Sequence, residues 1–184
     1  MCGLVSLQAS PLTSKQIENT WQTMLQSAPK NETFIQQVTT REEVSDVFVV
    51  LQINKNINQV WSEVVAFGTY ASKINELDEV DIYEKKDEIV KATFTFSKFF
   101  LSFNNSFIHT LDAKNHSLTW ELDTSRDYEM LNLSYGIWRF EKINEKKTRA
   151  YYQNSVSYLS WIPSMVVEYA LETGSKNSTL WLAK

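Results

Sequence analysis

The two histidines of the sequence are the side chains whose chemistry is easiest to place, and they lie in different settings. His116 belongs to the polar run DAKNHS, which is typical of a turn, so we expect it to be exposed to solvent. His109 shares a two-residue phase with the apolar residues Phe103, Phe107 and Leu111, so its ring is expected to point inward from a strand. We favour a hydrogen-bonded core histidine at this position, and a general base is the alternative.

Amphipathic side chains could supply further polar groups at the mouth of a cavity. The candidates are Tyr70, Tyr135, Tyr152 and Arg139. A tyrosine serves equally as core filler with a hydrogen-bonded tip, and we favour that interpretation for each tyrosine.

Few other residues are spaced for chemistry. Asp78, Glu79 and Asp81 follow the pattern of a solvated strand edge, and Cys2 is the single cysteine, which excludes an intrachain disulfide. No spacing of His, Cys and Asp provides converging metal ligands, and the scattered glycines form neither a phosphate loop nor a Gly-x-Ser-x-Gly elbow. We therefore predict no catalytic residue set, no metal and no cofactor, and lean toward a protein that is not an enzyme.

The composition of the 184 residues points to one domain with an ordinary core. The net charge of −4 argues against nucleic-acid binding, which needs a clustered basic face. Aromatic residues make up 13%, which fits either a large core, the interpretation we favour, or an aromatic-lined pocket. No run approaches the roughly 20 apolar residues of a membrane span, and the first ten residues lack the basic segment of a signal peptide. A cytoplasmic location is the expectation, with a leader removed from a longer precursor as the alternative.

The first 44 residues are predicted to form an arm that packs on the main domain. A helix is expected from about residue 13 to residue 27, because Ile17, Trp21 and Met24 recur at helical spacing. Residues 32–44 are polar and ambiguous. The main domain is expected to span residues 45–184.

The start of that domain predicts a strand, two short helices and then a meander. The apolar run VFVVLQI at residues 47–53 is typical of a strand. A helix at residues 59–67, capped by Asn58, should end at Gly68, and a second short helix is expected at residues 69–74. Alternation of apolar and polar residues then indicates antiparallel strands with one buried face. In one of these strands the inward residues are Val90, Ala92, Phe94 and Phe96.

Two features near the C-terminus concern the shape of the sheet and its helix. In the strand before the last, apolar residues change phase at Gly136, which predicts either a bulge or a strand buried on both faces in its middle. A helix is expected from Pro163 to Lys184, about 33 Å if continuous, although Gly174 could break it. Small residues, Ala170 among them, follow one side of this helix, which either lies close on the sheet or leaves unfilled volume beneath it.

Several segments resemble the START-related lipid-transfer superfamily, also called SRPBCC or helix-grip proteins. They are FTFSKFFLSFNNSFIHTLD, LTWEL, GIWRFE and KKTRAYY, and they look like the branch that contains coenzyme Q-binding and polyketide cyclase/dehydrase-like proteins. The most telling matches are the run Gly136, Trp138 and Phe140 and the pair Thr148 and Arg149. The resemblance covers residues 45–184, about three quarters of the chain, and the N-terminal helix departs from the minimal family pattern.

The resemblance implies an α+β helix-grip fold, in which a seven-stranded curved antiparallel sheet wraps around a long C-terminal helix and two short helices follow the first strand. It also implies an apolar cavity between sheet and helix, which in the superfamily holds sterols, phospholipids, isoprenoid quinones or polyketides. Plain core is the alternative for the inward aromatic residues. The residues expected to line the cavity are Tyr70, Phe94, Phe96, Phe103, His109, Trp120, Trp138, Phe140, Tyr152, Val167 and Ala170.

Three functions follow as hypotheses. The leading one is non-enzymatic binding or transport of a hydrophobic small molecule, such as a lipid, a quinone or a polyketide-like compound. This binding hypothesis is compatible with transient contact with a membrane surface, and it does not specify an oligomeric state. The second is an enzyme of cyclase or dehydratase type, in which His109 or Tyr152 moves protons. The third is a protein-interaction module that uses the N-terminal helix.

Overall fold

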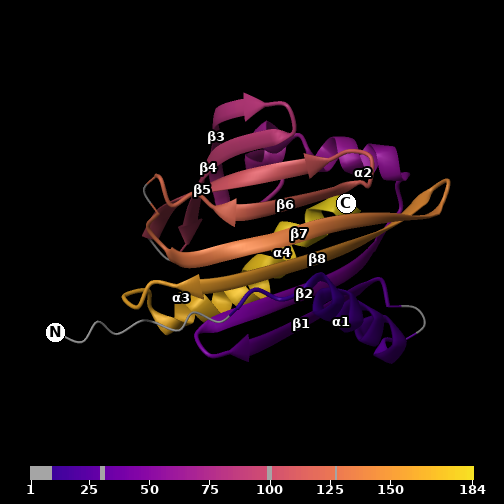
Figure 1. Ribbon diagram of the computed structural model, residues 1–184, viewed down its shortest axis with the longest axis horizontal. Coiled ribbons are helices and arrows are strands. Elements are labelled where there is room, and N and C mark those ends of the chain that lie inside the picture. The colour runs from indigo at the N-terminus through magenta and orange to yellow at the C-terminus, as the bar shows by residue number, and fades with distance from the viewer. Residues whose placement is uncertain (1–9, 30–31, 99–100, 127) are drawn as a thin grey trace.

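One curved antiparallel sheet wraps around the C-terminal helix (Figure 1). The computed structural model describes residues 10–29, 32–98, 101–126 and 128–184. Helix α1 (Ser14–Ser27) covers the outer face of the sheet, and the C-terminal helix, yellow in Figure 1, lies on the opposite, concave face. Strand alternation makes this possible, because Leu51 of the strand Val44–Ile53 packs into the inner core while its neighbour Val50 packs with α1.

Within the described residues the sheet has eight strands, and each pairs antiparallel with its neighbours. The last strand lies inside the sheet, beside β2, so the chain that follows it returns beneath the concave face. In spatial order the strands are β1 (Phe34–Arg41), β2 (Val44–Ile53), β8 (Lys147–Tyr158), β7 (Leu131–Asn144), β6 (Ser117–Leu122), β5 (Leu101–Asp112), β4 (Ile89–Lys98) and β3 (Leu77–Lys86).

The expectation of seven strands is wrong, because β1 adds an eighth at the edge of the sheet. Its residues pair with β2 from Phe34 opposite Leu51 to Arg41 opposite Val44. Its sequence, FIQQVTTR, carries polar residues at five of eight positions, so the apolar alternation that indicates a strand is weak. β1 falls inside residues 1–44 and extends the sheet directly.

The predicted N-terminal helix is confirmed as α1. The side chain of Thr13 accepts a hydrogen bond from the backbone of Gln16, whose side chain reaches back to the Thr13 backbone, so the helix begins with a capping box. Trp21 and Met24 are buried against β2 and β8, and the Trp21 indole N–H donates to the Tyr152 carbonyl at 3.2 Å. The apolar face of the helix therefore packs against the sheet.

The two short helices after β2 are confirmed with different bounds. They are α2 (Ile57–Val64) and a 3₁₀ helix, η1 (Phe67–Ser72). Gly68 lies within η1 and does not end α2, which stops four residues earlier. Asn56 caps α2 through its side-chain oxygen.

The C-terminal helix is continuous, so the alternative of a break at Gly174 is wrong, but the helix is not α-helical throughout. A π-helical segment, η2 (Ala170–Gly174), joins α3 (Ser164–Tyr169) to α4 (Ser175–Leu180), and a final 3₁₀ turn, η3 (Trp181–Ala183), follows. The wider π turn accommodates Gly174 within a continuous helix.

The phase change in β7 comes from a register shift between Leu131 and Leu133, upstream of Gly136. Gly136 itself pairs regularly with Asn154 of β8 and Trp120 of β6. A bulge is therefore present, as one alternative predicted, but it lies between Leu131 and Leu133 and not at Gly136. Beyond the bulge the even-numbered residues of β7 face the concave side, while Ile137 on the outer face packs under α1.

Candidate binding cavity

A cavity of about 260 Å³ lies between the concave face of the sheet and the C-terminal helix. Its helix wall carries the small residues Ala170, Gly174, Ser175 and Ser178, together with the larger Val166, Tyr169 and Leu171. Val166, Ala170, Gly174 and Ser178 recur every four residues, and the π segment Ala170–Gly174 lies in the middle of this row. Small side chains on this face leave the volume unfilled, as one of the two alternatives for the helix predicted.

Nine of the eleven residues expected to line the cavity do so. They are Tyr70, Phe94, Phe96, Phe103, His109, Trp120, Trp138, Tyr152 and Ala170. Phe140 and Val167 are not among the lining residues, and both expectations are corrected. Phe140 lies farther along β7, where its ring centroid is 6.4 Å from that of Trp61 in α2. Val166 and Val167 pack in the same satellite cluster, and of the two only Val166 also lines the cavity.

The sheet wall is built from aromatic rings that pack on one another. The rings of Trp120 and Tyr152 stack with centroids 5.4 Å apart, and Trp138 is tilted against Tyr152 at 4.8 Å. On the opposite side, Phe94 lies 6.3 Å from Phe96 in a stacked arrangement. The cavity is thus apolar over most of its surface, with preformed aromatic faces available to a ligand.

His109 is a buried, neutral side chain in the cavity wall. It is 6% exposed, and its ring centroid lies 4.5 Å from that of Phe67. Burial lowers the pKa of His109 to about 4, against a weaker opposing effect of a hydrogen bond with the Val90 backbone. Among the described residues Nδ1 has no hydrogen-bond partner. His116, in contrast to expectation, is half-buried beside Trp61, with a ring-centroid distance of 5.9 Å.

A band of hydroxyl and amide groups crosses the centre of the sheet wall. Ser134 of β7 donates to the side-chain oxygen of Asn154 at 3.1 Å, and both line the cavity with Tyr152 and Tyr158 of β8. Burial raises the pKa of Tyr152 and of Tyr158, so both phenols stay protonated. Sequence reasoning missed three of these four, although Asn154 and Tyr158 share the phase of Tyr152 along β8.

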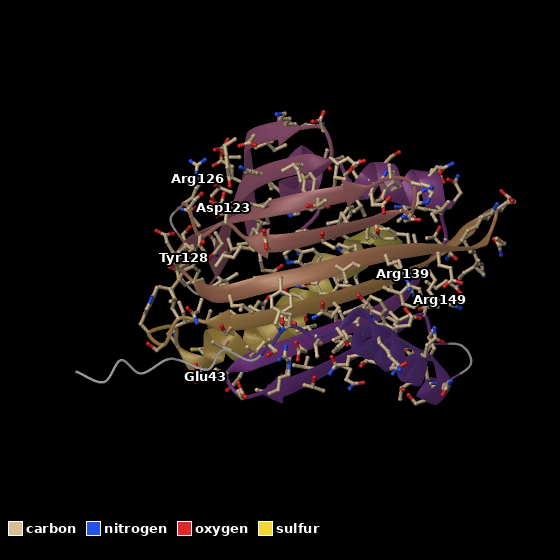
Figure 2. All side chains as sticks on the ribbon, in the orientation of Figure 1. Glu43, Asp123, Arg126, Tyr128, Arg139 and Arg149 are labelled. Carbon is tan, nitrogen blue, oxygen red and sulfur yellow. The ribbon has the colours of Figure 1, made fainter. Side chains whose placement is uncertain are left out.

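The other proposed polar groups lie elsewhere. Tyr70 lines the cavity but donates its hydroxyl to the Val64 carbonyl, and burial raises its pKa. Arg139 projects from β7 on the face that carries α1 (Figure 2), where it binds Glu18 at 2.6 Å. Tyr135 accepts a hydrogen bond from Arg41 on this outer side. Neither Arg139 nor Tyr135 is at the cavity mouth.

A carboxylate that the sequence did not single out lies at the helix side of the cavity. Glu76, just before β3, accepts hydrogen bonds from the Tyr169 hydroxyl at 2.6 Å and the Asn177 amide at 2.9 Å. Burial would raise the pKa of Glu76, but these hydrogen bonds hold it below its ordinary value. A lone glutamate at the end of a loop carries no sequence signal of such contacts. The carboxylates predicted for a solvated edge, Asp78, Glu79 and Asp81, are exposed.

Within the described ranges, no group of three or more His, Cys, Asp or Glu residues could hold a metal ion. None of the helices described is long and apolar enough to span a membrane.

Comparison with known proteins gives matches among solved structures. No family model matches the chain, and no curated protein matches it. The Zhui aromatase/cyclase from Streptomyces sp. R1128 is 11% identical with a TM-score of 0.68, over 76% of this chain and 92% of that one. A STAR-related lipid transfer protein from Xanthomonas axonopodis is 14% identical with a TM-score of 0.68, over 85% and 94%. A START superfamily protein from Mycobacterium smegmatis is 11% identical with a TM-score of 0.61, over 75% and 94%.

Proposed function

We propose that this chain, which has the helix-grip fold of the START-related (SRPBCC) superfamily, binds or carries a hydrophobic small molecule in its cavity. The observation that carries the proposal is the apolar cavity of about 260 Å³ walled by aromatic rings and by a helix face that includes four small residues. Such a face has no evident structural benefit, because larger side chains there would fill the volume and bury more apolar surface.

The size and lining of the cavity suit a lipid, a quinone or a polyketide-like compound. An engineered apolar cavity of about 150 Å³ stays dry and binds benzene, so this larger one has room for a more extended ligand. The central band of Ser134, Tyr152, Asn154 and Tyr158 supplies a few polar groups that can orient a ligand, as small-molecule sites do. The names of the similar structures, a lipid transfer protein and an aromatase/cyclase, support hydrophobic ligands as a class.

A titration tests this function. Fluorescent analogues of a lipid and of a quinone are added to the protein, and saturable one-to-one binding that an unlabelled competitor displaces is the expected result. The absence of saturable binding across lipid, quinone and polyketide-like probes would overturn the proposal.

A second candidate is catalysis of cyclase or dehydratase type, and one observation favours it. His109 and Tyr152 both line the cavity, so an imidazole and a phenol border the same volume. The cavity would fold the substrate while these two groups move protons. Incubation with a short poly-β-ketone, followed by mass spectrometry, should show loss of water that His109→Phe and Tyr152→Phe each abolish. An unchanged substrate would exclude this candidate and leave the carrier function intact.

The carrier function extends to a transient membrane contact at the start of α3. Trp161 and Met165 are each 59% exposed there, and their neighbour Val166 lines the cavity. Indole side chains favour the headgroup region of a bilayer, and a carrier has to load its ligand from such a surface. Wild-type protein should co-sediment with phosphatidylcholine vesicles more than Trp161→Ala does, and equal co-sedimentation would contradict this contact.

A further inference from the structure

The π segment η2 leaves one backbone carbonyl without its regular helical partner. The Ser175 N–H donates to the Ala170 carbonyl, five residues back, whereas in an α-helix it would donate to the Leu171 carbonyl, four residues back. The Leu171 carbonyl therefore needs another donor, because a carbonyl that is turned away from water is costly when it is unpaired. The segment keeps its π conformation only where such a donor is at hand.

Gln36 of β1 supplies this donor from the edge of the sheet. Its Nε2 lies 3.1 Å from the Leu171 carbonyl oxygen, 3.1 Å from the Glu172 carbonyl oxygen and 3.0 Å from Ser175 Oγ. The Ser175 hydroxyl also donates to the Leu171 carbonyl. Backbone carbonyls only accept hydrogen bonds, so the amide must present its nitrogen to them, and a carboxylate could not take its place. The eighth strand of the sheet is thus tied directly to the π segment.

The π segment decides which of the residues beyond it face the cavity. A regular α-helix turns by about 100° per residue, so it would place Ser175 about 140° and Ser178 about 80° away from the direction of Ala170. Asn177 would lie within about 20° of that direction. In the structure Ser175 and Ser178 line the cavity with Ala170, and the Asn177 amide donates to Glu76. The π turn therefore keeps two small hydroxyl side chains in this wall in place of the larger amide.

We infer that Gln36 is a positioning residue for the cavity: its side-chain amide holds η2 in the π conformation and thereby keeps Ser175 and Ser178 facing the ligand. The inference rests on the proposed function and adds to it a residue that sets the width of the cavity. Gln36 is not among the lining residues, so it acts through the helix and does not touch the ligand. β1 thereby shapes the site without lining it.

Three variants and a neutral apolar dye, N-phenyl-1-naphthylamine, test the inference by fluorescence titration of the folded protein. Gln36→Glu keeps the size of the side chain but places acceptor oxygens against the two carbonyls. Its affinity for the dye should fall about tenfold, because an α-helical register turns the larger Asn177 toward the cavity. Gln36→Lys restores donors and should bind within about threefold of the wild type. Gln37→Glu makes the same change at the next, exposed residue of β1 and should bind as the wild type does.

Backbone hydrogen exchange reports on the helix independently of binding. The amides of Gly174 and Ser175 should exchange about tenfold faster in Gln36→Glu than in the wild type, and at the wild-type rate in Gln37→Glu. Unchanged exchange or unchanged dye affinity in Gln36→Glu, or an equal loss of affinity in Gln36→Lys, would overturn the inference and leave the proposed function standing.

Two further outcomes are separated from these. A wild-type protein that binds no apolar probe would overturn the proposed function, and the inference with it. If Gln36→Glu does not fold, Gln36→Leu takes its place, because it removes the donors without adding a charge. Equal dye affinities of Gln36→Leu and Gln36→Lys would then overturn the inference, and a loss confined to Gln36→Leu would support it.

Discussion

Trp120 of β6 lies across Gly136 of β7, and the two residues are direct cross-strand partners. A Cβ atom at position 136 would come within 2.3 Å of Trp120 Cζ2 and within 2.2 Å of the Gln153 carbonyl oxygen. The glycine is required by this close approach, because it lets the indole lie flat over the backbone and stack on Tyr152. One wall of the cavity therefore depends on the absence of a side chain.

Gly136→Ala tests this dependence. The added methyl group must displace the indole and a backbone carbonyl, so we expect the free energy of unfolding to fall by about 1–3 kcal/mol or more, as in an overpacked core. Chemical denaturation measures the loss. Gly68→Ala is the matched control, since a Cβ at position 68 meets nothing within 4 Å and should change stability little. Equal effects of the two substitutions would contradict the packing described for Trp120.

Ala170→Leu tests whether the volume beneath the helix is real. Each added methylene that enters the cavity should contribute about 0.8 kcal/mol of burial, so stability should hold or rise while ligand binding falls. In a close-packed region the same change would cost about 1–3 kcal/mol. Thermal melting and probe titration measure the two effects. Thr173→Leu, on the exposed side of the π segment, should leave binding unchanged.

The helix-grip architecture could be predicted from the sequence because its signals are local and repeated. Alternating residues such as Val90 and Phe94 marked the buried face of the sheet, and Pro163 marked the start of the last helix. β1 was missed because an edge strand tolerates polar residues such as Gln36 and Thr39, so its alternation is weak.

The candidate site was predicted in its apolar part and missed in its polar part. Phase along a strand places Phe94, His109 and Tyr152 on the inner face without knowledge of the fold. The contacts of Glu76 join residues about 100 positions apart, and no local pattern indicates them. Val166 and Val167 lie four and three residues before Ala170, so helical spacing alone does not decide which of them lines the cavity.

The buried imidazole of His109 predicts a pH dependence of stability. Its pKa is about 4 in the folded state and about 6.5 in an unfolded chain, so between these values the unfolded state binds the proton more readily. The contribution is fully present above about pH 6.5 and is lost as the pH falls toward 4, by about 3 kcal/mol. Urea denaturation across this range should show the loss in wild type and in His116→Asn. If the free energy of unfolding of His109→Phe fell with pH as steeply as that of the wild type, the role given to His109 would be contradicted.

Two substitutions in α1 test whether this helix is a structural arm or a partner-binding module. Trp21 is 2% exposed, its ring centroid lies 5.2 Å from that of Tyr151, and its loss should cost about 3–5 kcal/mol. Glu18→Gln removes a half-exposed ion pair with Arg139 and should cost less than about 1 kcal/mol. Denaturation of Trp21→Ala and Glu18→Gln gives both values. If a partner protein bound the wild type but not Trp21→Ala, and the two were equally stable, α1 would instead be an interaction module.

Native mass spectrometry of protein purified gently and without refolding tests the central claim most directly. The account predicts a one-to-one adduct with the mass of an apolar small molecule, which organic extraction removes, and which is depleted in Ala170→Leu but retained in Thr173→Leu. A protein that shows only its own mass, and that stays unliganded after incubation with lipid, quinone and polyketide-like probes, would contradict the claim that this cavity is a binding site.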